Sequence, residues 1–292
     1  MFESADPLAP HAPRTPRERA RAGFTADLLA AARARVREDG AAALSLRAVA
    51  RDLGVASSAV YRYVDSRDAL LTLLIVEAFD AAGAACEEAA GRAFARGAEP
   101  GEVWLAVARA FRAWALRDQH AFELIYGTPV RGYMAPQETV RHATRVWGAL
   151  GSVIATAMAS GKLHAAGPRP EARALVAPEV VEFASSLGAA DATPPGIDPR
   201  DLAATGVLDS AVLFAALLGA VSMELYGHLH GVMTDLGRAF DAAMVAAAAG
   251  IGLEVTLDGV SVDDLPADDL PADDLPGEDR RADDVAAEVA AG

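Results

Sequence analysis

The stretch LSLRAVARDLGVASSAVYRYVDSRDAL, residues 44–70, decides the fold of this chain. Apolar residues follow Ser45 at spacings of three and four and the pattern ends at Gly54, which predicts a short helix capped by Ser45. A second short apolar pattern runs from Val55 to Tyr63, and Ser66 is suited to cap a longer helix. Two short helices joined by a glycine-containing turn are typical of a helix-turn-helix.

The flanking segments complete a three-helix unit. From about Thr15 to Asp39 the apolar residues lie three and four apart, which predicts a first helix that ends at Gly40. The residues after Ser66 are broadly apolar as far as Phe94, as expected for a helix that connects two domains. We therefore place this unit at residues 14–79 and expect a disordered tail at residues 1–13.

The second short helix leaves Ser57, Ser58, Tyr61 and Arg62 outward, because its apolar residues face the core. In a helix-turn-helix this element enters the major groove of DNA, where an arginine can bond a guanine edge bidentately. Arg47 and Arg67 begin the neighbouring helices and are placed to contact backbone phosphates on either side. A flexible basic arm is expected before the first apolar stripe, formed by Arg14, Arg17, Arg19 and Arg21.

From Phe24 to about Phe79 the chain resembles the TetR family of transcriptional regulators, on the segments LSLRAVARDLGV, AVYRYV and DSRDALL. The resemblance implies an all-helical homodimer in which each subunit has an N-terminal three-helix DNA-binding domain. It also implies a C-terminal helical bundle for ligand binding and dimerisation.

The resemblance extends to individual positions. Ser57 and Ser58 match the recognition helix, Tyr61 and Tyr63 match phosphate-contacting positions, and Arg67 stands where the family usually has lysine. Three residues depart from the family pattern. Ala56 replaces the usual capping serine, Tyr63 replaces histidine and Val64 replaces phenylalanine.

Residues 80–253 read as a second, all-helical domain, so the expected fold class is all-α. The only strand-like fragment is IGLEVTL at residues 251–257, and breaks rich in proline and glycine separate the predicted helices. These helices are expected at residues 101–117, 118–126, 137–160, 171–187, 199–230 and 234–249.

Aromatic residues recur on three of these helices, and a mostly apolar cavity between helices is the usual form of a small-molecule site. Ordinary core packing is the alternative for each of them. The candidate ligand-binding residues are Trp104, Phe111, Trp114, Phe122, Tyr126 and Trp147. His142, Glu224 and His228 are candidate polar partners for a ligand.

The segments 199–230 and 234–249 are the predicted dimer interface, because the first is almost continuously apolar. Small residues there allow close approach of a partner helix: Ala215, Ala216, Gly219 and Ala220. The segment also resembles a C-terminal subtype of the family named for a Trp, a His and a Gly. Those positions read Phe214, Leu218 and Gly219 here, so only the glycine matches.

Composition bounds the remaining possibilities. The chain contains no recognisable catalytic motif, and the one cysteine, Cys86, excludes an internal disulfide, so we expect neither an enzyme, a metal nor a cofactor. It begins without an apolar targeting segment, and its most apolar run, 211–221, is shorter than a bilayer requires. A soluble cytoplasmic protein that makes no contact with a membrane is expected.

The net charge of −15 is distributed unevenly. Residues 14–70 hold eleven arginines against seven acidic residues, whereas residues 254–292 hold thirteen acidic residues against two arginines. The repeated DDLPA in the second segment predicts a disordered acidic tail, which either aids solubility or competes with phosphate for the arginines. The overall acidity therefore does not exclude DNA as a partner.

The expected function is a dimeric DNA-binding transcriptional regulator, a repressor released from its double-stranded operator by a small-molecule effector. Binding between the helices of residues 101–160 would move the two DNA-reading helices through the helix at 66–96. One alternative is an activator or an adaptor. Another is a helical bundle that binds or converts a small molecule and has an incidental helix-turn-helix.

Overall fold

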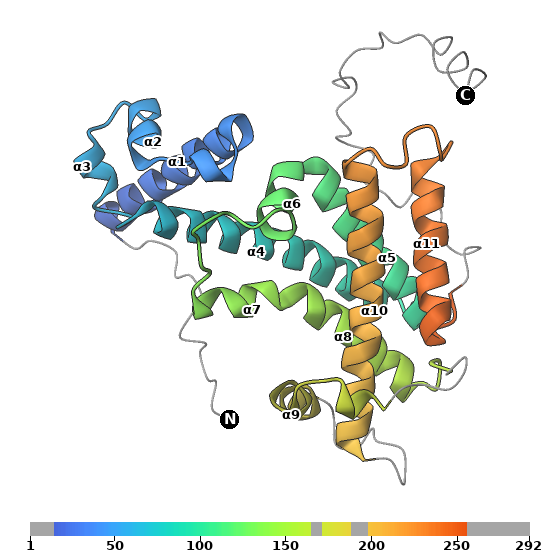
Figure 1. The fold of residues 1–292 in the computed structure, drawn as a ribbon. Coiled ribbons are helices and arrows are strands. Elements are labelled where there is room, and N and C mark those ends of the chain that lie inside the picture. The colour runs from blue at the N-terminus through green and yellow to red at the C-terminus, as the bar shows by residue number, and fades with distance from the viewer. Residues whose placement is uncertain (1–14, 165–170, 188–197, 256–292) are drawn as a thin grey trace, which may run out of the picture. The chain divides into compact units, whose positions relative to one another are not determined.

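The computed structural model describes residues 15–164, 171–187 and 198–255, and within these ranges the regular secondary structure is helical (Figure 1). The one departure within these ranges is an isolated antiparallel bridge between Leu163 and Leu253, and Leu253 belongs to the strand-like fragment predicted at residues 251–257, of which residues 256 and 257 lie outside the described ranges. The all-α prediction is confirmed. The tails predicted at 1–13 and 254–292 lie outside the described residues except for Glu254 and Val255, and so does Arg14.

The N-terminal unit consists of α1 (Pro16–Asp39), a 3₁₀ turn η1 (Ala41–Ala43), α2 (Leu46–Asp52), α3 (Ser57–Val60) and the start of α4 (Arg67–Ala95). Its core is apolar, with Leu28, Val49, Val60 and Leu70 fully buried. Gly54 has a φ of +66°, a left-handed conformation that the turn between α2 and α3 requires. These helices pack as the apolar spacing predicted.

The three N-cap residues of α2, α3 and α4 differ in whether the side chain makes a capping hydrogen bond. Ser66 accepts a hydrogen bond from the backbone N–H of Ala69, which confirms the predicted cap of α4. Ser45 occupies the N-cap position of α2, but its side chain makes no capping hydrogen bond, so that prediction was right in position only. Ala56 occupies the N-cap position of α3, where an alanine has no oxygen to offer.

The predicted flexible arm is wrong for Arg17, Arg19 and Arg21, because all three lie within α1. A capping box starts the helix before them: Thr15 accepts a bond from the backbone of Glu18, whose carboxylate accepts one from the backbone of Thr15. Local capping therefore makes this segment helical without burial.

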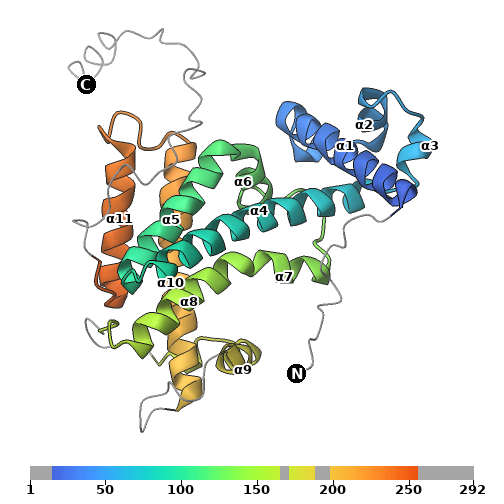
Figure 2. The ribbon, with the colours of Figure 1, turned by 180° about the vertical axis from the view of Figure 1, so that it is seen from behind.

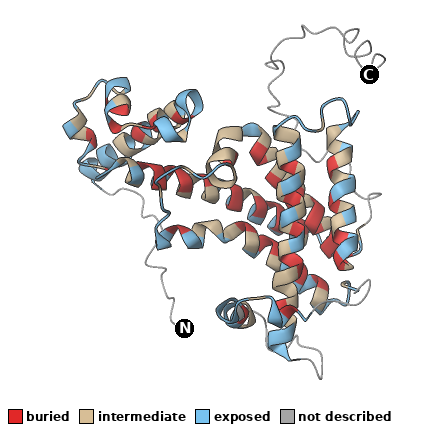
Figure 3. Cartoon of the chain, in the orientation of Figure 1, coloured by how far each residue is buried: buried red, intermediate tan, exposed pale blue. Residues whose placement is uncertain are grey.

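Helix α4 joins the N-terminal unit to the remaining helices and runs beside α5 (Pro100–Arg117) and α8 (Arg145–Ala159), as both views show (Figure 2). Residues along its length are buried, from Leu70 and Leu71 to Ala89, Ala90 and Ala93 (Figure 3). A Cβ atom on Gly83 would lie 2.5 Å from the Cβ of Arg145, so a glycine permits this close approach of α4 and α8.

The other elements of the bundle are mostly those expected. They are α6 (Gln119–Tyr126), η2 (Gln137–Thr139), α7 (Val140–Ala143), η3 (Ala172–Ala174), α9 (Pro178–Leu187), α10 (Pro199–Leu225) and α11 (Leu236–Ile251).

Three boundaries differ from the prediction. The segment 137–160 divides into η2, α7 and α8, and the regular helix in 171–187 begins only at Pro178. The helix expected to reach residue 230 ends at Leu225, and two glycines with φ values of +74° and +71°, Gly227 and Gly231, turn the chain towards α11. Apolar composition continues through that turn, which is why the sequence pattern overran the helix.

Bidentate ion pairs attach the last two helices to α5. Arg112 holds the carboxylate of Glu224 on α10 at 2.7 and 2.5 Å, and Arg109 holds Asp241 on α11 at 2.9 and 2.6 Å. Glu224 is therefore a structural partner in this fold, whereas the sequence offered it as a ligand contact.

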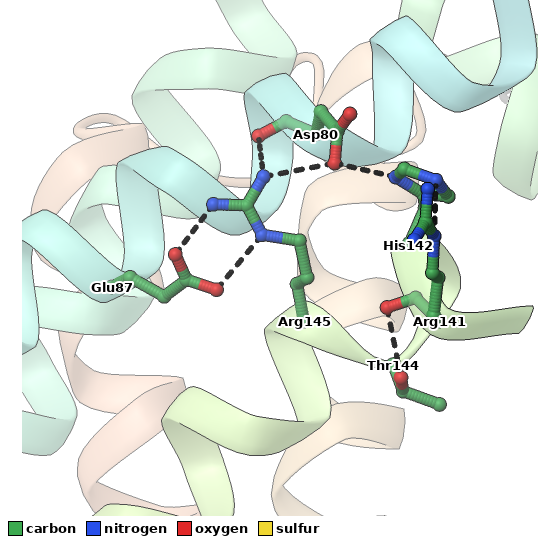
Figure 4. A network of polar contacts seen from close by, with 6 residues as sticks. All are labelled: Asp80, Glu87, Arg141, His142, Thr144 and Arg145. Carbon is green, nitrogen blue, oxygen red and sulfur yellow. Dashed lines mark hydrogen bonds and ion pairs between the residues drawn. The ribbon is translucent and has the colours of Figure 1, made fainter. Parts of the chain in front are cut away.

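A second polar network links α4 to α7 and α8 (Figure 4). Arg145 bonds Asp80 at 2.9 Å and Glu87 at 2.9 and 2.5 Å, and His142 Nδ1 lies 2.8 Å from the same Asp80 carboxylate. Hydrogen bonds from His142 and Arg145 outweigh burial and lower the pKa of Asp80. His142, another candidate ligand contact, thus packs two helices together, while His228 is exposed in the turn after α10.

Among the described residues, two helices, α4 and α10, are long and apolar enough to cross a membrane by length and composition. Half of the most apolar window of α4 is buried inside the fold, whereas a third of that of α10 is buried. The run at 211–221 that looked too short to span a bilayer is thus part of a 27-residue helix.

Candidate functional site

The predicted DNA-reading residues lie together on and beside α3. Ser58, Tyr61 and Arg62 are spaced three and four apart and are exposed, with 49% of Tyr61 accessible. Ser57 is half-buried, and Arg47 is exposed at the start of α2. Within the described ranges neither Arg47 nor Arg62 makes an ion pair, so both guanidinium groups can meet an anion.

Helix α3 is shorter than the pattern from Val55 to Tyr63 suggested, because regular helix covers only Ser57–Val60. The chain continues in helical turns, with the backbone N–H of Arg62 bonded to Ala59 and that of Tyr63 bonded to Val60. Arg62 therefore keeps its helical direction although it lies beyond the regular helix.

Tyr63 has a packing role that the sequence did not reveal. Its ring is half-buried against Phe24 of α1, with the ring centroids 4.3 Å apart, and the guanidinium of Arg21 lies 5.6 Å from its centroid. The tyrosine thus packs α1 against the turn that follows α3. Contact of Tyr63 with phosphate stays a prediction.

Arg67 is engaged inside the protein. It donates from Nε to the carbonyl of Leu44 at 3.1 Å, and from Nη2 to the carbonyls of Ala41 and Ala42 at 3.0 and 3.1 Å. Its Nη1 bonds the neighbouring Asp68 at 3.0 Å. The forked guanidinium thereby ties the start of α4 to η1, which no local sequence signal indicates.

Replacing Arg67 by lysine should separate these two roles. The ammonium group keeps the positive charge but cannot reach three carbonyls in a fork, so the free energy of unfolding should fall by about 1–2 kcal/mol. Urea denaturation followed by circular dichroism measures the loss. Unchanged stability together with weaker DNA binding would instead assign Arg67 to the phosphate backbone.

Several arginines of the N-terminal unit are neutralised by acidic partners. Arg35 of α1 grips Asp52 at the end of α2 with two bonds of 2.6 and 2.7 Å, and these bonds lower the pKa of Asp52. Arg33 pairs with Glu77 of α4, and Arg37 with Asp118 at 3.2 Å. Within the described residues the unpaired charge therefore concentrates around α2, α3 and the start of α1.

The six aromatic residues predicted to bind a ligand fall into three groups in the structure. Phe111, Trp114, Phe122 and Tyr126 pack against one another with ring centroids 5.4–6.3 Å apart. Trp104 lies apart from them and donates its Nε1–H to the backbone carbonyl of Met244 on α11 at 3.0 Å. Trp147 stacks on Phe214 of α10, with the centroids 4.8 Å apart. Core packing, the alternative to ligand binding, is sufficient to account for these contacts, and ligand binding by these residues stays a prediction.

The hydroxyl of Tyr126 is an exception within this core. It is buried without a hydrogen-bond partner among the described residues, while its ring touches Phe79, Phe111, Phe122 and Phe214. Burial raises its pKa well above the ordinary value, and burial likewise raises the pKa of nearby Cys86 to about 12. An unsatisfied buried hydroxyl is costly, so it marks a place where a ligand acceptor would be favourable.

Two pockets lie elsewhere in the described fold. One, of about 190 Å³, is formed by α1, α4, α5 and α6 and includes Trp114 among its walls. The other, of about 380 Å³, lies between α4 and α8, beside Arg145. Of the six predicted aromatic residues, only Trp114 lines either of these pockets.

Comparison with known proteins agrees with this architecture. Residues 28–74 match the family model described as "Bacterial regulatory proteins, tetR family", and residues 104–247 match that described as "Tetracyclin repressor-like, C-terminal domain". The second match does not test the Trp-His-Gly subtype, which stays a prediction.

Two curated relatives are HTH-type transcriptional regulators, Mb1846 of Mycobacterium bovis and Rv1816 of Mycobacterium tuberculosis. Each is 37% identical over 235 residues, which cover 77% of this chain and 91% of the relative.

Among solved structures, the regulatory protein SCO4313 is similar with a TM-score of 0.59 and 29% identity, over 80% of this chain and all of that one. A protein of unknown function from Rhodococcus sp. RHA1 shares the fold, with a TM-score of 0.56 and 23% identity over 78% of this chain and 94% of its own.

Proposed function

This chain belongs to the TetR family of DNA-binding transcriptional regulators, and from that premise we propose that it is a dimeric repressor that leaves its operator when a small molecule binds its helical bundle. The observation that carries the proposal is Arg62, which is exposed beside Ser58 and Tyr61 and makes no ion pair among the described residues, shortly before the core helix α4 that reaches into the bundle.

The reading surface supports specific recognition of DNA. Arg62 offers the bidentate donor geometry that suits the O6 and N7 atoms of guanine, and Ser58 and Tyr61 offer hydroxyl groups for phosphate or base contacts. Arg47 adds an unpaired charge on α2. We assign the phosphate contacts to Arg47 and to the arginines at the start of α1. Arg67 and Tyr63 act indirectly, because they hold the helices of the DNA-binding unit together.

The outward face of α10 supports a dimer. Val212, Ala215, Gly219 and Met223 recur at spacings of three and four and are all exposed, and no charged residue lies between Asp209 and Glu224. Ala242, Ala246 and Ala249 expose a similar face on the neighbouring α11. Water-exposed apolar stripes of this length on two adjacent helices favour a second copy of the chain as their cover.

The effector site is proposed at the aromatic cluster of the bundle. The unsatisfied Tyr126 hydroxyl supports this place, because an acceptor on a bound molecule would restore its missing hydrogen bond. Binding there would press on Phe79 of α4, the helix that carries the DNA-binding unit. An effector releases DNA only if it binds the released arrangement more tightly than the operator-bound one.

A fluorescence anisotropy titration with the DNA upstream of the coding sequence tests the DNA-binding part of this proposal. Arg62→Ala should weaken binding by about 10- to 100-fold, because a good arginine–guanine contact contributes roughly 1–3 kcal/mol. Arg92→Ala is the matched control, since Arg92 is an exposed arginine on α4 that pairs with Glu88.

The salt dependence adds an independent criterion. Affinity for the wild type should fall steeply as salt rises, since each phosphate contact releases counterions. Two results would contradict the proposed interface. One is a wild-type affinity for DNA that does not change with salt, and the other is an equal affinity of Arg62→Ala and Arg92→Ala for DNA.

A further inference from the structure

The pocket of about 190 Å³ lies where the DNA-binding unit meets the bundle. Arg33, Val36 and Arg37 of α1 form one wall, and residues of α4, α5 and α6 form the others. It is thus distinct from the aromatic cluster of the bundle, with which it shares only Trp114.

The floor of this pocket is apolar and its rim is charged. Leu74 and Ala78 of α4, Trp114 of α5 and Leu124 of α6 supply the apolar surface. Two ion pairs cross the joint at the rim, one between Arg33 and Glu77 and the other between Arg37 and Asp118. Apolar walls with a few fixed polar groups are the usual form of a small-molecule site.

One polar group in the pocket lacks a partner. The Oε1 atom of Glu77 accepts a bond from Arg33, whereas its Oε2 atom is buried with no hydrogen-bond donor among the described residues. A carboxylate oxygen accepts hydrogen bonds only, and its terminal torsion turns readily. A small rotation would therefore present this acceptor to a donor on a bound molecule.

The volume limits the size of that molecule. A cavity of roughly 150 Å³ holds one benzene ring, so a pocket of about 190 Å³ takes a single ring with one short substituent. We propose that this pocket is an effector site for a compact single-ring molecule that carries a hydrogen-bond donor, an amine or a hydroxyl group, placed against Glu77.

A molecule bound at this site controls the orientation of the DNA-binding unit relative to the helical bundle. A molecule seated between α1 and α4–α6 contacts both sides at once and competes with Arg33 for Glu77, one of the two ion-paired links across the joint. It therefore favours one angle between the DNA-binding unit and the bundle over others. This effect on DNA rests on the proposed function; the binding itself does not.

The binding test uses calorimetric titration of the full-length protein with three single-ring probes of similar size: benzylamine, benzyl alcohol and benzoate. The amine and the alcohol should bind at least about tenfold more tightly than benzoate, which has no donor for Glu77. Glu77→Gln removes the negative charge and replaces one acceptor oxygen by an amide nitrogen that only donates, so the preference for the amine over benzoate should shrink. Tighter binding of benzoate to the wild type would overturn the assigned ligand class.

A pocket-filling variant locates the binding. Ala81 lines the pocket on the exposed side of α4, so Ala81→Leu fills it without disturbing the core and should weaken benzylamine by about tenfold. Ala84→Leu, at an exposed position one turn further along α4, should bind as the wild type does. Equal affinity of both variants would place the probe elsewhere and overturn the proposal.

The DNA readout separates this inference from the proposed function. Benzylamine at a concentration that saturates the wild type should shift its anisotropy midpoint for upstream DNA by about fivefold or more, and should shift that of Ala81→Leu clearly less, because this variant binds the probe more weakly. If the protein binds DNA and bound benzylamine does not change the affinity for DNA, the regulatory part of this inference is wrong, but the binding site is not. Probe binding in a protein that never binds DNA leaves the site standing and contradicts the proposed repressor.

Discussion

Gly219→Glu is expected to leave the subunit folded and to abolish high-affinity operator binding. A Cβ atom at Gly219 meets nothing within 4 Å, and glutamate favours a helix by roughly 0.5–1 kcal/mol over glycine, so the isolated subunit should be at least as stable. In a dimer built on α10 the same carboxylate would be buried against a symmetry-related carboxylate, both without a counterion.

The consequence for DNA should be large. Two half-sites bound by one dimer gain roughly 10²- to 10⁴-fold in avidity over a single subunit, and this gain disappears with the dimer. Sedimentation velocity should show a monomer, and anisotropy should show at least about a hundredfold weaker binding. Ala84→Glu is the control for an added charge, since Ala84 is exposed on α4 away from the stripe. If the Gly219→Glu protein remains dimeric, the outward face of α10 does not form the dimer interface.

The second large effect is expected at the ion pair that fixes α10 to α5. Glu224 has 7% and Arg112 has 20% of its side chain exposed, and the guanidinium also lies 5.4 Å from the centroid of Phe240. Glu224→Ala leaves this arginine without its counterion in a mostly buried place. The free energy of unfolding should fall by about 3 kcal/mol, at the lower end for a broken buried pair because Arg112 is partly solvated.

A double variant distinguishes a lost partner from a lost side chain. Glu224→Leu combined with Arg112→Met replaces both charges by apolar groups of similar size and should recover most of the stability. Urea denaturation of the three proteins gives the comparison. If Glu224→Ala is as stable as the wild type, the ion pair between Arg112 and Glu224 is solvated and does not fix α10 to α5.

The two predictions concern opposite faces of the same helix. Its inward face carries Leu213, Leu217 and Val221, all fully buried, together with Glu224, whereas its outward face exposes the apolar stripe that includes Gly219. Stability should therefore depend on the inward face and association on the outward face. Measuring stability and association together on all of these variants separates the two roles.

Sequence reasoning worked best where a structural feature depends on nearby residues. The cap at Ser66, the glycine turn at Gly54 and the exposure of Ser58, Tyr61 and Arg62 all depend on spacings of a few positions. It failed where composition continued beyond a structural boundary, as in the turn after Leu225. It also failed at the start of α1, where basic residues suggested a flexible arm although a capping box makes them helical.

Site residues were harder to predict, because polar side chains can serve either a ligand or the fold. Arg67 could be named as a basic residue near DNA, yet its partners are carbonyls 23 to 26 positions earlier. Glu224 looked available for a ligand, but the arginine that holds it is 112 positions away. The predicted aromatic residues have a helical spacing in either role, and only their contacts distinguish core from cavity.

By itself the sequence determined the helix-turn-helix, the all-α architecture and the exposure of the polar residues on α3 and in the turn after it, because periodicity, caps and turns are local properties of the chain. Only the tertiary structure decided which charges remain free, which aromatic residues become core and where pockets open. Those outcomes depend on pairs such as Arg33 with Glu77 and Trp104 with Met244, which lie 44 and 140 positions apart. Local spacing carries no information about such pairs, and packing brings them together.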